Sequence, residues 1–273
     1  RRHTRSAFVT GVQTCALPSS IAGADDAETT IGSNVISGWV TSGRFCGAGN
    51  RYRLYFRAEF SQPFASFGTW KNGSVTPGQT SERGGSEPKI DLRKSNAPKT
   101  LAAQAGVPRA AVAPMDTTVS GPGTGGYVTF DSLAAPTVQV RIGLSFVSLD
   151  GARKNLRAES GSKSFDAIVG AARASWNAVL GRIAVTGGTD AERTTFYTAL
   201  YHSLLQPNVF SDTDGRYLGF DGRVRTAERG HTVYTNFSGW DVYRSQMQLL
   251  ALIAPKEASE DRKSTRLNSS HER

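Results

Sequence analysis

The hydrophobic pattern of the chain changes its period near Gly151, and this change constrains the fold more than any other feature. Before that point apolar and polar residues alternate, most clearly over residues 51–60 and 138–148, and such alternation predicts strands with one buried face. After it, apolar residues recur every three or four positions, which predicts amphipathic helices. Strands followed by helices predict a β domain joined to an α domain, with the strands forming an antiparallel sandwich.

The helical part contains recognisable start and stop signals. Ser164 and Thr189 each precede an apolar periodic run and can accept a hydrogen bond from an amide of the first turn, so we expect each to cap a helix. A last helix is expected over about residues 240–253, because Pro255 follows. Residues 71–126 are rich in Gly, Pro, Ser and Ala and show little periodicity, so we expect mainly long loops there.

Two terminal segments are interpreted as translated sequencing-library adapter. The DNA GTGACTGGAGTTCAGACGTGTGCTCTTCCG encodes residues 9–18, and its reverse complement encodes residues 262–271. Two unrelated natural termini would not encode each other on opposite strands. We therefore treat residues 1–20 and 261–273 as adapter-like artefacts rather than as a basic arm and a Ser-rich tail. We expect residues 1–18 and 262–273 not to pack on the body of the chain.

The charge of the body argues against a nucleic-acid partner. The formal net charge is +9, of which residues 1–20 contribute +3 and residues 261–273 contribute +2, so that +4 remains. A charge of that size does not by itself predict binding to nucleic acid. We also expect no membrane span, because no apolar run approaches the roughly 20 residues that a membrane helix needs.

Several blocks, in the same order along the chain, resemble glycoside hydrolase family 92. Residues 234–246 (YTNFSGWDVYRSQ) are similar to the strand-to-helix segment that opens the family's helical catalytic domain. Residues 196–207 and 212–217 resemble an early helix and a turn of that domain, and residues 140–148 resemble the end of the family's N-terminal sandwich. The resemblance implies an N-terminal antiparallel β-sandwich over 21–160, incomplete at its start, and the first helices of a truncated (α/α)6 toroid over 161–260.

The same resemblance implies an activity. Family members are α-mannosidases that release terminal mannose with inversion at the anomeric carbon. The resemblance therefore implies mannose-containing glycans as partners, whether simple α-mannosides or N-glycans, and a secreted or periplasmic enzyme. It also implies a calcium ion that bridges two mannose hydroxyls, a Glu general acid and an Asp general base. In the family these carboxylates lie far downstream. We therefore expect neither catalytic residues nor metal ligands in this chain, and no activity from the chain alone.

Trp240, Asp241 and Arg244 are the predicted substrate-binding residues. In the resembled family the Trp-Asp pair belongs to the pocket for terminal mannose. A Trp ring offers an apolar face to a sugar, and a carboxylate accepts hydrogen bonds from sugar hydroxyls. Arg244 follows Asp241 by one helical turn and could orient that carboxylate. The structural alternatives are that Trp240 packs in the core, that Asp241 caps a helix, and that Arg244 forms a structural ion pair.

Other polar residues favour structural roles. His202 lies on a helix among aromatic and aliphatic residues, where a packed side chain is the usual outcome. Asp212 and Asp214 flank a Gly-containing turn, but the later Glu of a calcium loop is missing. The alternative function for the whole chain is a non-catalytic, carbohydrate-binding β-sandwich protein with accessory helices.

Overall fold

The structure, a computed structural model, describes residues 6–8, 26–43, 51–84, 124–131, 137–219, 221–235 and 242–269. The chain forms two compact units. One comprises residues 9–54 and 58–140, and the other comprises residues 1–8, 55–57 and 141–273. Most of the sheet strands before residue 140 belong to the first unit, and all of the described helices belong to the second.

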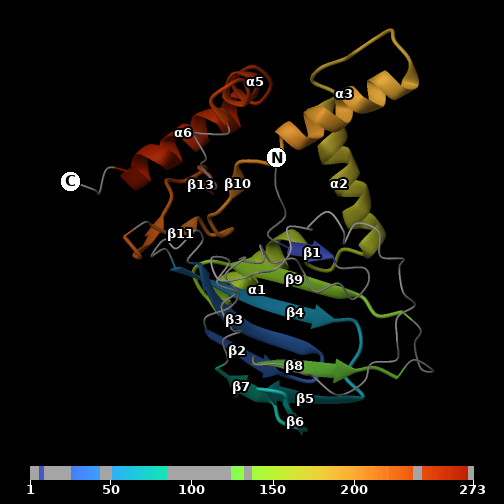
Figure 1. The fold of residues 1–273 in the computed structure, drawn as a ribbon, viewed down its shortest axis with the longest axis vertical. Helices are drawn as coiled ribbons and strands as arrows, with labels where there is room; N and C mark the ends of the chain where they lie inside the picture. Colours follow the sequence, from blue (N-terminus) through green and yellow to red (C-terminus); the bar gives the residue numbers. More distant parts are fainter. Residues whose placement is uncertain are drawn as a thin grey trace, which may run out of the picture. The chain divides into compact units, whose positions relative to one another are not determined.

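Antiparallel strands make up the N-terminal half, as the alternating pattern predicted (Figure 1). One sheet has six strands in the order β1-β9-β4-β3-β2-β7, and another has three in the order β6-β5-β8. The bounds are β1 Ser6–Phe8, β2 Asp26–Ile31, β3 Val35–Gly43, β4 Arg51–Phe60, β5 Ser66–Lys71, β6 Ser74–Pro77, β7 Ser81–Arg83, β8 Thr124–Thr129 and β9 Val140–Ser145. The predicted fold class, a β-rich N-terminal part followed by helices, is confirmed.

The strands of the first unit pack closely where glycine allows it. Ile31 of β2 is buried. Gly126 of β8 lies against it so closely that a Cβ would stand 2.9 Å from Ile31 Cδ1. Strands β5 and β6 are joined by a turn in which Asn72 and Gly73 have φ values of 51° and 83°, a conformation typical of a tight hairpin. Residues 71–126 therefore contain strands β6 and β7 and the start of β8, where the sequence predicted mainly loops.

Two helices begin where the sequence predicted. Ser164 accepts a hydrogen bond from the amide of Ala167, and Thr189 forms a capping box with Glu192. The helices are α1 Leu149–Glu159, α2 Phe165–Leu180, α3 Asp190–Ser203, α5 Gln246–Ile253 and α6 Pro255–Ser269. The short strands among them are β10 Asn208–Val209, β11 Arg216–Leu218, β12 Val224–Thr226 and β13 Tyr234–Thr235. Helix α5 begins later than the predicted residue 240, because residues 243–245 form a turn.

The expectation that the terminal segments do not pack on the body was wrong. Strand β1 pairs with β9 in antiparallel register, with Ala7 opposite Ile142. Helix α6 continues through residues 262–269, and the buried Ser264 Oγ accepts a 3.0 Å hydrogen bond from the amide of Tyr234. The physical reason is local. Strand pairing needs only backbone groups, and a helix already begun at Pro255 gains one backbone hydrogen bond for each residue added, without a new nucleation step.

Candidate functional site

The structure places one of the three predicted site residues. Trp240 and Asp241 lie outside the described residues. Arg244 is exposed, its Nε donates a 2.8 Å hydrogen bond to Tyr243 Oη, and its guanidinium lies 5.4 Å from the Tyr243 ring centroid. Because Arg244 belongs to the turn before α5, helical spacing from Asp241 no longer supports its predicted role. The assignment of all three residues to substrate binding stays a prediction.

The described residues on either side of that segment are firmly held. On the N-terminal side, β13 pairs with β10, with Tyr234 opposite Val209. On the C-terminal side, Gln246 at the start of α5 donates from Nε2 to the carbonyl oxygens of Ser203 at 2.9 Å and Gln206 at 3.4 Å. The two elements that flank the predicted sugar-binding segment are therefore held in place, β13 by its pairing with β10 and the start of α5 by hydrogen bonds to residues at the C-terminal end of α3.

A hydrophobic core supports these attachments. Its buried members come from the helices of the second unit: Val179, Leu200, Leu204, Leu250, Ile253 and Ala254. Leu204 and Leu250 are fully buried. The guanidinium of Arg182, just after α2, also donates to the carbonyl oxygen of Ile253 at the end of α5. The helix that follows the predicted sugar-binding segment is thus fixed to α2 and α3 by apolar burial and by a hydrogen bond between elements.

Among the described residues of this unit, the most deeply buried carboxylate belongs to Asp212, which the sequence identified only as a turn residue. Asp212 is 3% exposed. Its Oδ1 accepts a 2.8 Å hydrogen bond from Asn155 Nδ2, and its Oδ2 accepts one of 2.8 Å from Ser145 Oγ. Burial raises the pKa of the Asp212 carboxyl, and the hydrogen bonds from Asn155 and Ser145 counteract part of that rise. Asp212 therefore connects the end of β9 to α1 through two hydrogen bonds that are buried from solvent.

The region around Asp212 and Asp214 is a turn, as predicted, and does not fit a calcium ion. Gly215 has φ of 84°, and its amide donates to the carbonyl oxygen of Asp212 at 2.9 Å. The Asp214 carboxylate pairs with Arg216 at 2.9 Å and with Lys154 at 3.5 Å. Across the part of the chain that the structure describes, no three His, Cys, Asp or Glu side chains gather closely enough to hold a metal ion.

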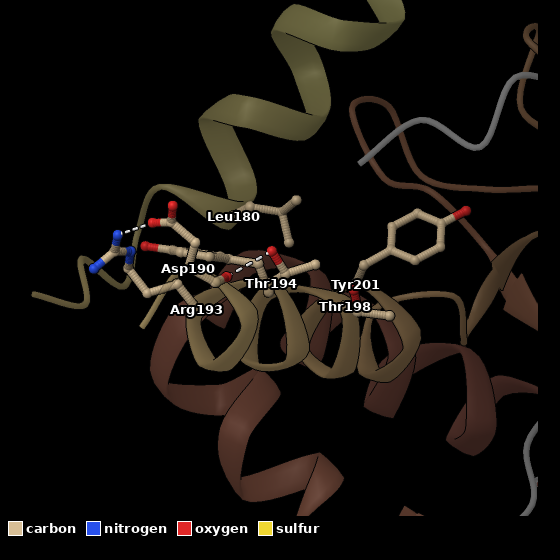
Figure 2. Close-up of a pocket in the computed structure, with 7 residues that line it drawn as sticks. Leu180, Asp190, Arg193, Thr194, Thr198 and Tyr201 are labelled. Atoms are coloured by element: carbon tan, nitrogen blue, oxygen red, sulfur yellow. Dashed lines mark hydrogen bonds and ion pairs between the residues drawn. The ribbon is translucent and has the colours of Figure 1, made fainter. Parts of the chain in front are cut away.

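An open pocket lies on the exposed side of α3 (Figure 2). Its volume is about 640 Å³, and its lining residues are Leu180, Asp190, Arg193, Thr194, Tyr197, Thr198 and Tyr201. Asp190, its one acidic lining residue, is paired with Arg193, so the lining lacks the two carboxyl groups that glycoside hydrolysis requires. Phe196 and Tyr201 on this helix are exposed, as is Leu252 on α5.

Family comparison accounts for both halves of the chain. The model described as the glycosyl hydrolase family 92 N-terminal domain matches residues 14–145, and the model described as the catalytic domain of the same family matches residues 151–269. The chain belongs to glycoside hydrolase family 92. In this family 92 chain, the two matched regions meet at the change of hydrophobic period near Gly151.

Solved structures share the fold of this family 92 chain. The family 92 glycosyl hydrolase ccman5 is 26% identical, with a TM-score of 0.69, over 90% of this chain and 28% of that one. The inverting mannosidase BT2199 of Bacteroides thetaiotaomicron is 24% identical, with a TM-score of 0.69, over 90% and 29%. The α-mannosidase BT3965 of the same organism is 23% identical, with a TM-score of 0.67, over 91% and 29%. No curated protein matches the chain.

The chain spans less than a third of the length of these solved relatives. The resemblance inferred from the sequence is confirmed, as is the order of a β domain followed by the start of a helical domain. Within the described residues, no helix is long and apolar enough to cross a membrane.

Proposed function

We propose that this chain is part of an inverting, calcium-dependent exo-α-mannosidase, secreted or periplasmic, that releases terminal mannose from α-mannosides or N-glycans. The observation that carries the proposal is the ordered match of one chain to both domains of family 92. The names of similar solved structures also support it. One is an inverting mannosidase and another is an α-mannosidase, which also has a structure in complex with mannoimidazole. The match of residues 151–269 to a catalytic domain disfavours a carbohydrate-binding sandwich without catalysis.

In this proposal, the chain contributes to substrate binding. Asp241 accepts hydrogen bonds from hydroxyls of the terminal mannose, and Trp240 offers its apolar face to the ring. Arg244, in the turn before α5, is the third residue proposed to bind the substrate. These contacts hold the sugar, but binding that is equally strong in the ground state and the transition state does not accelerate the reaction.

The proposal assigns the general acid and the general base to sequence beyond these 273 residues. Inversion needs one carboxyl group to protonate the leaving oxygen and another, about 6.5–9.5 Å away, to activate water. Among the buried carboxylates, Asp212 is engaged by Ser145 and Asn155, and it lies in a closed network rather than in a pocket. The calcium ligands are likewise proposed to lie outside the described residues.

The test uses the protein expressed from the complete reading frame, with an aryl α-mannoside as substrate. Proton NMR of the first turnovers should show β-mannose before mutarotation, because inversion converts an α-glycoside to the β-anomer. A calcium chelator should abolish release, and added calcium should restore it. Initial release of α-mannose would contradict inversion, chelator-resistant release would contradict calcium dependence, and absence of mannose release would overturn the proposed function.

A further inference from the structure

A buried network joins the two regions that the family models match. Ser145 is the last residue of the N-terminal match and Gly151 is the first residue of the catalytic match. Ser145 donates to Asp212 Oδ2, and Gly151 lies so close that a Cβ would stand 2.3 Å from the same oxygen. We propose that Asp212 acts as a carboxylate lock that fixes the end of β9 to α1 and to the turn at residues 212–215, so that residues 141–150 form a rigid segment within the second unit rather than a flexible linker.

Ser145 makes the lock specific for a carboxylate. Its Oγ accepts hydrogen bonds from the amides of Val147 at 2.9 Å and Ser148 at 3.2 Å, which occupy both lone pairs of the hydroxyl oxygen. The hydroxyl proton is therefore directed to Asp212 Oδ2. An amide nitrogen or a protonated oxygen in place of Oδ2 would bring a donor to an oxygen with no acceptor capacity left. The lock accordingly fits a group that only accepts hydrogen bonds.

Asn155 completes the lock from α1. Its Nδ2 donates to Asp212 Oδ1 and to the carbonyl oxygen of Leu144, both at 2.8 Å. Its Oδ1 accepts from the amide of Thr213 at 2.8 Å and from Thr213 Oγ1 at 2.9 Å. One side chain thus ties β9, α1 and the turn at residues 212–215 together. Buried networks of this kind are strongly specifying when every member is satisfied.

The backbone on both sides of the lock is also closely packed. A Cβ on Gly143 would stand 2.2 Å from the carbonyl oxygen of Ala152, so β9 and α1 are in direct contact. Phe146 lies with its ring centroid 4.7 Å from that of Phe210. Ser148 caps α1 by accepting a 3.0 Å hydrogen bond from the amide of Gly151. These contacts hold the backbone along the segment between Gly143 and Gly151, as expected for a rigid segment rather than a flexible linker.

Hydrogen exchange tests the lock without relying on the proposed activity. The protein from the complete reading frame is compared with its Asp212→Asn and Ser145→Ala variants, and the exchange rates of the Val147, Ser148 and Thr213 amides are measured. Loss of about 1.4 kcal/mol of local opening free energy corresponds to about tenfold faster exchange, which we expect in both variants. Asp214→Asn is the matched control, because Asp214 is more exposed and pairs with Arg216 and Lys154; it should leave these amides within about twofold of wild type.

The outcome that overturns the inference is wild-type exchange in Asp212→Asn, since an amide would then serve as well as a carboxylate. Should that variant fail to fold, Ser145→Ala, which removes one hydroxyl, decides the matter by the same measurement. In Ser145→Ala the deciding amide is that of Thr213, because the variant itself removes the acceptor of the Val147 and Ser148 amides; wild-type exchange at Thr213 would likewise exclude the lock. Equal acceleration by Asp214→Asn would show a general loss of stability and would also contradict it.

Discussion

Replacing Asp241 with Ala in the complete enzyme should lower kcat/KM for an aryl α-mannoside by about 100-fold. The proposed role of Asp241 is to accept hydrogen bonds from mannose hydroxyls with an ionised carboxylate. Hydrogen bonds to charged groups contribute about 1.5–3 kcal/mol, and 2.7 kcal/mol corresponds to about two decades in rate. The effect is measured from initial rates at substrate concentrations well below KM.

Asp190→Ala is the matched control for this experiment. The Asp190 side chain is 94% exposed at the start of α3, so its removal should leave kcat/KM within about threefold of wild type. Thermal melting of both variants separates a loss of function from a loss of folding. An Asp241→Ala enzyme that melts like wild type and has wild-type kcat/KM would contradict the assignment of Asp241 to the mannose pocket.

Replacing Gly143 with Ala should destabilise the protein by about 3 kcal/mol or more, the upper part of the range for overpacking. The added methyl would lie 2.2 Å from the carbonyl oxygen of Ala152, 2.7 Å from Leu156 Cβ and 3.1 Å from the Leu156 amide nitrogen. Two of these atoms belong to the backbone of α1, so no side-chain rotation relieves the contact. The prediction is checked from the urea midpoint of the unfolding transition.

Gly170→Ala provides the opposite expectation within the same unit. Gly170 lies inside α2, and an added Cβ would have no atom within 4 Å other than its chain neighbours and the backbone of its own helix. Because Ala is favoured over Gly in a helix by about 1 kcal/mol, this variant should be more stable than wild type. Equal urea midpoints for Gly143→Ala and Gly170→Ala would show that β9 and α1 are not in the close contact described here.

The features that the sequence predicted correctly depend on neighbouring residues. Ser164 and Thr189 cap their helices because a side-chain oxygen meets an amide only three residues away. The turn at residues 212–215 forms, with Gly215 at a φ of 84° and its amide donating to the carbonyl oxygen of Asp212, because that turn chemistry is also local. Helix starts and tight turns could therefore be predicted from the sequence alone.

The features that were missed depend on residues far apart in the chain. Strand β7 pairs with β2, with Ser81 opposite Thr30. The three residues of β7 are too few to show a periodic pattern that would predict this pairing. Asp212 was interpreted as a turn residue, which is correct, but its partners Ser145 and Asn155 lie 67 and 57 positions away. One signal was present: Asn155 is a polar residue on the buried face of α1, between Ala152 and Leu156.

The sequence and the structure each describe a different part of the candidate site. The sequence identified Trp240 and Asp241 through family resemblance, and the structure describes the elements that flank them, β13 and α5. It also changed the interpretation of Arg244, which lies in a turn rather than on the helix that its spacing suggested. The location of the flanking elements follows from core residues such as Leu204 and Leu250, whose helical spacing the sequence shows.

These 273 residues are proposed to carry the mannose-binding pair of a family 92 enzyme without its catalytic carboxylates. The most direct test measures mannose release from an aryl α-mannoside by the purified 273-residue chain and by the product of the complete reading frame, each with calcium and with a chelator. We predict no turnover by the 273-residue chain in either condition, and calcium-dependent turnover by the complete product. Turnover by the purified 273-residue chain would contradict the claim.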